Sequence, residues 1–84
     1  MKNKILVIVY VPLIEKEYDI YIPTIKKVGA VKKLIMEVIE ENSEGIFKND
    51  GNKHLYDKFT GEKIIDNQFV RNSNIKNGTK LILY

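Results

Sequence analysis

The stretch NSNIKNGTKLILY, residues 72–84, shows how the chain closes its fold. Asn77-Gly78 is a typical turn dipeptide, and the apolar run after it predicts a strand over residues 80–84. A matching run near the other end, ILVIVYV at residues 5–11, is rich in β-branched side chains and predicts a second strand. Both runs are apolar at odd and even positions alike, whereas one face of an open antiparallel strand should be polar.

The segment between these runs predicts a further strand and a helix. YDIYI at residues 18–22 alternates in polarity and predicts the hairpin partner of residues 5–11, ending at Pro23 because proline cannot donate to a strand ladder. Residues 27–42 change to a helical period and predict an amphipathic helix of about four turns. Its apolar stripe consists of Val28, Val31, Leu34, Ile35, Val38 and Ile39.

The remaining segments are shorter and less regular. Residues 43–53 are turn-rich, and short strands are expected at residues 54–57 and 63–65 on either side of Thr60-Gly61. The later core anchors are expected to be Phe69, Val70 and Ile75. The element order is therefore β-β-α-β-β-β, an α+β class, in a single domain spanning residues 1–84.

Composition narrows the classes of function. A chain of 84 residues suffices for one domain with a thin core, and the absence of cysteine removes disulfides, thiolate nucleophiles and cysteine-ligated metal sites. The net charge of +3 comes without a long basic block, so it gives only weak support for a nucleic-acid partner. The longest apolar run is shorter than the ~20 residues of a membrane span, and no cleavage site follows the first residues. We expect a cytoplasmic protein without membrane insertion.

The residues that carry catalysis are sparse. His54 is the single histidine, and without a cysteine or a suitably spaced carboxylate it predicts neither a catalytic triad nor a zinc site, but a partly exposed strand residue. Asp50-Gly51-Asn52 lacks the repeated acidic ligands of a calcium loop and predicts a turn. Gly29 and Gly61 do not form a phosphate-binding pattern. We therefore expect no enzyme, no cofactor and no metal.

Several stretches resemble known ubiquitin-like proteins. VGAVKKLI, residues 28–35, is similar to the first half of the ubiquitin helix in its apolar spacing, and NIKNGTKLIL, residues 74–83, resembles the run into the final ubiquitin strand. YDIYIP at residues 18–23 and IKNGTKLIL at residues 75–83, with Gly61 at the same distance before Ile75, resemble the bacterial YukD/EsaB family. The resemblance covers essentially the whole chain. It implies a ubiquitin-like β-grasp with mixed sheet order 2-1-5-3-4 and one helix on one face.

The same resemblance implies a function. Members of that family are cytosolic accessory components of type VII (ESX-type, WXG-protein) secretion systems, so the chain is expected to be a protein-binding adaptor. It departs from the family in residues 43–53 and at Lys26 and Lys27. One alternative is a ubiquitin-like modifier or sulfur carrier, which needs a flexible tail ending in two glycines, whereas this sequence ends at Tyr84; a native extension past that residue would reverse this preference. Another alternative is a small basic nucleic-acid-binding domain.

Two surfaces are candidates for partner binding. If Leu6, Ile8 and Tyr10 face the helix, as the family resemblance implies, the valines between them face away; a slip of one residue would exchange the two sets. The resulting apolar surface, on the sheet face opposite the helix, would bind another protein, such as a secretion-system component, or a second copy of the chain. It consists of Val7, Val9, Tyr21, Ile82 and Tyr84.

The second candidate surface lies on the helix, whose first half is rich in lysine and whose end is rich in glutamate. This arrangement is unfavourable for the helix macrodipole, and one interpretation is a dipolar surface that orients a charged partner. The alternative is an ordinary solvated helix face. Lys32 and Lys33 are the residues of this second surface.

Overall fold

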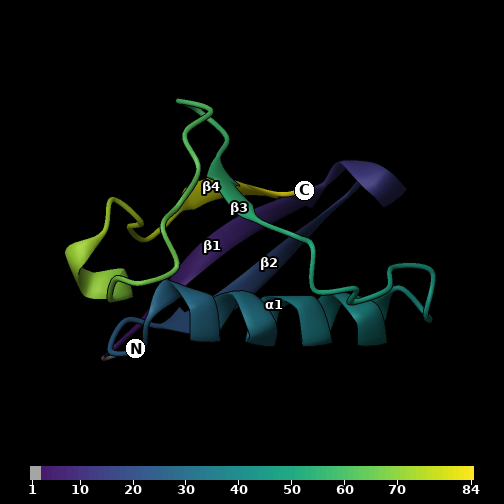
Figure 1. Cartoon of the computed structure of the whole chain (residues 1–84), viewed down its shortest axis with the longest axis horizontal. Coiled ribbons are helices and arrows are strands. Elements are labelled where there is room, and N and C mark those ends of the chain that lie inside the picture. The colour runs from purple at the N-terminus through teal and green to yellow at the C-terminus, as the bar shows by residue number, and fades with distance from the viewer. Residues whose placement is uncertain (1–2) are drawn as a thin grey trace.

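The computed structural model describes residues 3–84 and contains one long helix lying across one face of a sheet (Figure 1). Its strands are β1 (Lys4–Val11), β2 (Lys16–Pro23), β3 (Leu55–Asp57) and β4 (Thr79–Leu83), and the helix is α1 (Val28–Asn42). Two short 3₁₀ turns, η1 (Pro12–Ile14) and η2 (Val70–Asn72), complete the elements. The predicted α+β class is confirmed.

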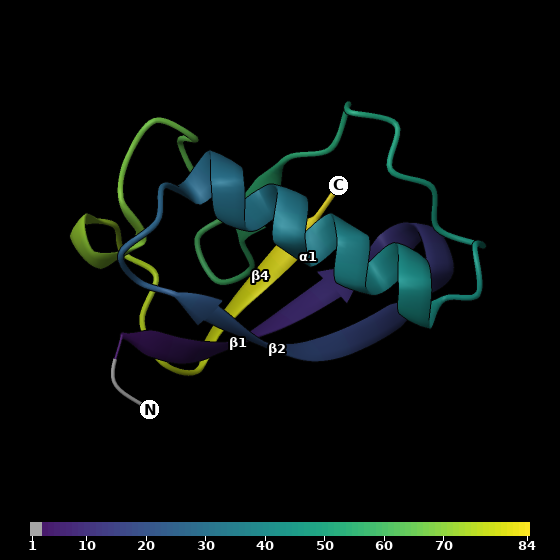
Figure 2. The ribbon, with the colours of Figure 1, turned by 90° about the horizontal axis from the view of Figure 1, so that it is seen from below.

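The sheet has four strands in the order β2-β1-β4-β3. β1 pairs antiparallel with β2 and parallel with β4, while β3 pairs antiparallel with β4, so the sheet is mixed and the last strand lies inside it as predicted. Figure 2 shows α1 crossing over these strands on one side. The predicted positions of the first, second, third and last strands are confirmed.

The strand expected at residues 63–65 is reduced to one bridge between Tyr56 and Lys63. The chain leaves the sheet after Ile64, whose amide still donates to Leu55 O at 2.8 Å. Residues farther along are held elsewhere, because Asp66 O accepts from Gly29 N at 3.0 Å and Gln68 O accepts from Val28 N at 2.8 Å. These carbonyls satisfy amides of the first helical turn, which has no side-chain cap, and they draw the chain away from a longer strand.

The core lies between α1 and the sheet and includes Met36 and Phe47, which the helical stripe and strand patterns did not predict. Two expected core residues are exposed instead, Leu34 at 43% and Phe69 at 36%. Leu34 lies one residue, or about 100° of helical rotation, from the buried Ile35, and therefore points away from the buried face of α1. The buried apolar residues are Val7, Val9, Val11, Ile20, Ile22, Val28, Val31, Ile35, Met36, Ile39, Phe47, Leu55, Ile64, Val70, Ile75, Leu81 and Leu83.

The turn-rich segment after α1 is anchored by its own contacts. Phe47 is fully buried, and its amide donates to Ser43 Oγ at 3.0 Å. The Ser43 hydroxyl in turn donates to Glu40 O at 3.2 Å, so the end of the helix and the start of the loop share one buried hydroxyl. Farther along, Asn49 N donates to the Glu40 carboxylate at 2.7 Å. The loop is thus tied back to the last turn of α1.

Candidate protein-binding face

The sheet face opposite α1, called the outer face below, carries a different set of β1 residues from the one predicted. Val7 and Val9 are fully buried under the helix and cannot bind a partner, which corrects the prediction. Alternation along the strands places the following residues on the outer face: Leu6, Ile8 and Tyr10 of β1, Tyr21 of β2, Tyr56 of β3, and Ile82 and Tyr84 at the end of β4.

The register of the first hairpin explains this exchange. Val7 lies opposite Ile20 and Val9 opposite Tyr18, and residues opposite each other in a ladder point to the same face. On β2 the carboxylates of Glu17 and Asp19 are exposed, so the residues that alternate with them must turn inward. The valines of β1 therefore turn inward together with the apolar residues of β2.

Aromatic and aliphatic side chains form a row across the middle of the outer face. Tyr10 lies beside Ile82, and Ile82 lies beside Tyr56. The ammonium of Lys58 is 5.2 Å from the centroid of the Tyr10 ring and 3.8 Å from the Glu17 carboxylate. Because Lys58 follows β3 and Glu17 belongs to β2, at opposite edges of the sheet, this side chain lies over the row.

Tyr84 extends the outer face past the end of β4. Its amide donates to His54 O at 2.9 Å, and its carbonyl accepts from His54 N at 3.1 Å. This pairing fixes the backbone, while the tyrosine side chain is 70% exposed. His54 lies just before β3, with intermediate exposure and with a buried Nδ1 that has no partner among residues 3–84.

The two lysines of the second candidate surface are not equivalent. Lys32 is 9% exposed, and its ammonium donates to Asp66 Oδ2 at 2.9 Å. It therefore joins the helix to the segment after β3 and is not a free cation. Lys33 is exposed, so only half of the predicted pair can meet a partner.

Comparison with known proteins identifies the fold. No protein-family model matches the sequence, and no curated protein matches it. Among solved structures, the ubiquitin-like domain of the Arabidopsis thaliana protein At2g32350 matches with a TM-score of 0.72 at 18% identity, over 98% of this chain and 77% of that chain. The fold is the ubiquitin-like β-grasp. The N-terminal ubiquitin-like domain of the 4931431F19Rik protein also matches, with a TM-score of 0.72 at 18% identity, over 100% of this chain and 76% of that chain.

A further match belongs to an inner membrane complex. One chain of the MycP5-free ESX-5 inner membrane complex matches with a TM-score of 0.72 at 14% identity. The match covers 98% of this chain and 21% of that chain. At these identities the likeness is one of fold. Within residues 3–84 of the ubiquitin-like chain, no helix is both long and apolar enough to cross a membrane.

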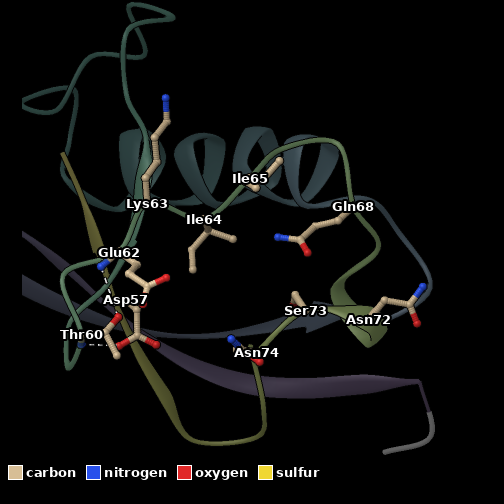
Figure 3. Close-up of a pocket in the computed structure, with 10 residues that line it drawn as sticks. All are labelled: Asp57, Thr60, Glu62, Lys63, Ile64, Ile65, Gln68, Asn72, Ser73 and Asn74. Carbon is tan, nitrogen blue, oxygen red and sulfur yellow. Dashed lines mark hydrogen bonds between the residues drawn. The ribbon is translucent and has the colours of Figure 1, made fainter.

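A polar hollow of about 450 Å³ lies between the segment after β3 and the segment around η2 (Figure 3). Asp57 is engaged there, because its Oδ1 accepts from the amides of Phe59 and Thr60 at 2.8 and 3.0 Å. Ser73 is engaged as well, since its hydroxyl donates to Val70 O at 2.6 Å. The Lys63 side chain points away from the hollow. These contacts hold turns in place and do not pair a nucleophile with a base.

The turn at Asp50 adopts the conformation expected from its sequence. Asp50 Oδ1 accepts from Asn52 N at 2.9 Å, and the Lys53 ammonium lies 3.6 Å from Oδ2. These contacts, first the backbone hydrogen bond and then the lysine charge, lower the pKa of Asp50 from its ordinary value. Within the part of the chain that the structure describes, no three His, Asp or Glu side chains gather in a way that could hold a metal ion.

Proposed function

We propose that this ubiquitin-like domain is a non-catalytic adaptor that binds a partner protein on its outer face. The observation that supports the proposal is the row Tyr10, Ile82 and Tyr56, which β1, β4 and β3 place side by side on the outer face, partly exposed and next to the exposed Tyr84. Complete burial of a fully exposed apolar side chain returns about 1.5–3 kcal/mol, so these partly covered side chains return a fraction of that each, and contiguous apolar patches commonly mark interfaces. Tyrosines suit this role because they offer a large area with few rotatable bonds.

We further propose that the partner is a component of a type VII secretion system, at its cytoplasmic side. Support comes from the sequence resemblance to the YukD/EsaB family and from the fold shared with a chain of the ESX-5 inner membrane complex. A single-stranded nucleic acid is the second candidate, because Lys58 and Lys80 accompany the tyrosines of the outer face. Glu17 and Asp19, at the β2 edge of the same face, oppose a polyanion and favour the protein partner.

The test uses purified WXG-type substrate and the cytoplasmic part of the secretion ATPase from the same organism. Binding to the parent domain would be measured by calorimetry and compared with an Ile82→Thr/Tyr84→Thr variant. The matched control is Leu34→Thr, an exposed apolar residue on the helix. We expect the double variant to lose about tenfold or more in affinity and the control to bind as the parent does.

Three results would contradict parts of this proposal. A double variant that binds as tightly as the parent removes the outer face as the site. A parent domain that binds neither secretion component removes the assignment to secretion. Tight, salt-sensitive binding of a single-stranded oligonucleotide, lost in the same double variant, would replace the protein partner with a nucleic acid.

A further inference from the structure

The charges of the domain are segregated along its longest axis. α1 runs along this axis, and the views in Figures 1 and 2 agree that residues 24–27 and 66–75 lie at the end where it starts. Residues 12–15 and the loop after residue 42 lie at the opposite end. The first end is rich in basic side chains and the second in glutamates, so they are called the basic end and the acidic end below.

The basic end presents an aromatic ring between two cations. Lys27 and Phe69 face each other in an isolated bridge, and hydrogen bonds from Val70 N to Lys26 O and from Arg71 N to Thr24 O extend the pairing. The Phe69 ring centroid is 5.8 Å from the Lys27 ammonium and 5.1 Å from the Arg71 guanidinium. Ile25, at 50% exposure, adds a second apolar side chain at this end. The basic end is thus an apolar centre with a cationic rim.

The acidic end has the same plan with the opposite charge. Leu13 and Ile46 are 68% and 72% exposed and border one shallow hollow between η1 and the end of α1. Glu15 borders the same hollow, and Glu44 lies two residues before Ile46. A neighbouring hollow is lined by glutamates of α1 and by Glu44, while Lys16 borders the first hollow and the Lys48 ammonium lies near Gly45. The glutamates of that neighbouring hollow are Glu37, Glu40, Glu41 and Glu44.

Neither charged end is neutralised within the domain. The ion pairs found among residues 3–84 are Lys32–Asp66, Lys53–Asp50 and Lys58–Glu17, and none of them involves the rim residues of either end, Lys26, Lys27, Arg71, Glu15, Glu37, Glu40, Glu41 or Glu44. The distribution also opposes helix stability, because α1 has no acidic residue in its first turn and no basic residue in its last. Glu15 and Glu44 have left-handed backbones with φ of 52° and 55°, where glycine would be less strained.

We propose that the acidic end of one copy docks on the basic end of another, so that the domain associates head to tail with itself. The apolar centres of the two ends can pack against each other. The glutamates of one end can pair with the lysine and arginine side chains of the other. The two ends are different surfaces, so the contact is heterologous, and successive copies extend into an open chain unless the rotation closes a ring. This inference uses the two ends and not the outer face, and it does not rest on the proposed function.

The size of the ends limits the strength of the contact. The domain measures 32 × 26 × 21 Å, so an end face offers on the order of 400 Å² per copy. Stable interfaces bury more than about 1,000 Å² in total, and the head-to-tail contact is therefore weak and concentration-dependent. Charge complementarity in such a contact is screened within about 10 Å at 0.1 M salt, which makes the association sensitive to ionic strength.

The first experiment follows self-association of the full chain by sedimentation and by amide NMR spectra. Protein concentration would be raised from about 0.05 to 1 mM, where a contact of this size becomes populated, at about 0.02 M and about 0.5 M salt. At low salt we expect the average mass to rise and resonances at both ends to shift together, including those of Phe69 and Ile46. We expect high salt to weaken the association about tenfold or more.

Charge reversal then separates a real interface from general charge effects. Lys27→Glu/Arg71→Glu makes both ends acidic, and Glu41→Lys/Glu44→Lys makes both ends basic. Each variant alone should lose self-association, while their equimolar mixture should associate, because the intact acidic end of the first meets the intact basic end of the second. Phe59→Ser, which removes a 96% exposed aromatic of the turn after β3, outside the residues that form either end, is the control and should associate as the parent does.

Three outcomes would overturn the proposal. One is a parent domain that stays monomeric at about 1 mM and low salt. Another is a reversal variant that remains folded and associates like the parent, and the third is a mixture of the two variants that does not associate. Loss of association in the outer-face variant Ile82→Thr/Tyr84→Thr, with both charged ends intact, would instead move the self-contact to the outer face.

Discussion

At the scale of single residues, the candidate binding surface depends on which way the side chains of β1 and β4 point. Val9 and Ile82 both belong to apolar strands, yet Val9 is fully buried under α1 and Ile82 lies on the outer face with intermediate exposure. Apolar residues of two adjacent strands thus have opposite roles, one in the core and the other on the candidate binding surface. A substitution that is harmless at one position is expected to be damaging at the other.

Replacing each of these two residues by threonine tests this assignment. Val9→Thr keeps the shape of the side chain but buries a hydroxyl, and we expect it to lower the free energy of unfolding by about 1–3 kcal/mol. Ile82→Thr leaves its hydroxyl in contact with water, and we expect a loss of less than about 1 kcal/mol. Urea denaturation followed by circular dichroism measures both values. Equal losses for the two variants would contradict the orientation of these side chains, Val9 of β1 inward and Ile82 of β4 outward.

At the scale of elements, the segment after α1 is held by one buried aromatic residue and one buried hydroxyl. Phe47 contributes to the same core as the helix and the sheet, and its amide is bound by Ser43. Its neighbour Ile46 is 72% exposed. A stretch that is turn-rich in sequence is therefore an integral part of the packed domain, because a single side chain reaches the core.

The adjacent pair offers a matched test of that anchor. Phe47→Ala removes a large fully buried ring, and we expect it to lower the free energy of unfolding by about 3–5 kcal/mol. Ile46→Ala removes a side chain that is mostly in water, and we expect a change within about 0.5 kcal/mol. Thermal denaturation of the two variants compares them directly. The anchor role would be refuted if Phe47→Ala melted at the temperature of the parent.

At the scale of the whole molecule, the side-chain charges have the same sign as the helix dipole at each end of α1, positive where the helix begins and negative where it ends. Lysines and Arg71 gather at the end where α1 begins, and glutamates gather where it ends. Each charge near a helix terminus costs about 0.3–1 kcal/mol in this unfavourable order at low salt. The arrangement lowers stability and at the same time creates two complementary ends, so stability and self-association are expected to respond oppositely to charge reversal.

An Ala30→Glu/Glu41→Lys variant tests this opposition. It places an acid in the first turn and a base near the last turn, and we expect the free energy of unfolding to rise by about 0.5–2 kcal/mol at low salt. We expect the gain to shrink at high salt and the head-to-tail association to weaken in the same variant. Denaturation and sedimentation at two salt concentrations measure both effects. A variant that gains stability and associates more tightly would contradict the link between them.

Much of the architecture follows from local sequence patterns. The β-branched run before Pro12 and the apolar run after Asn77-Gly78 predict strands, because these residues fit a pleated, buried surface and the turn residues bound it. The helical period from Val28 predicts α1, which ends at Asn42 as expected. The position of β1 and β4 inside the sheet was implied by the family resemblance and is confirmed.

The candidate site was predicted only in part, because the side of the sheet to which each of its side chains points depends on how the strands pair. Tyr21, Ile82 and Tyr84 lie on the outer face, whereas Val7 and Val9 do not. In a strand that is apolar throughout, the period of two carries no information about which set is buried. The hairpin turn sets the register of β1 against β2, and the exposed carboxylates of β2 then decide which side of both strands meets water.

What the sequence by itself determined is the type and order of the elements, because helix and strand periods and turn residues act over a few neighbouring positions. What only the tertiary structure decided depends on segments far apart in the chain. Phe69 is exposed while Val70 is buried because their segment pairs with residues 24–27, and the strand expected at residues 63–65 is lost to hydrogen bonds with the start of α1. The separation of charge along α1 itself is visible in the sequence, but only the tertiary structure adds Arg71 to the basic end and Glu15 to the acidic end, because segments far apart in the chain then share one surface.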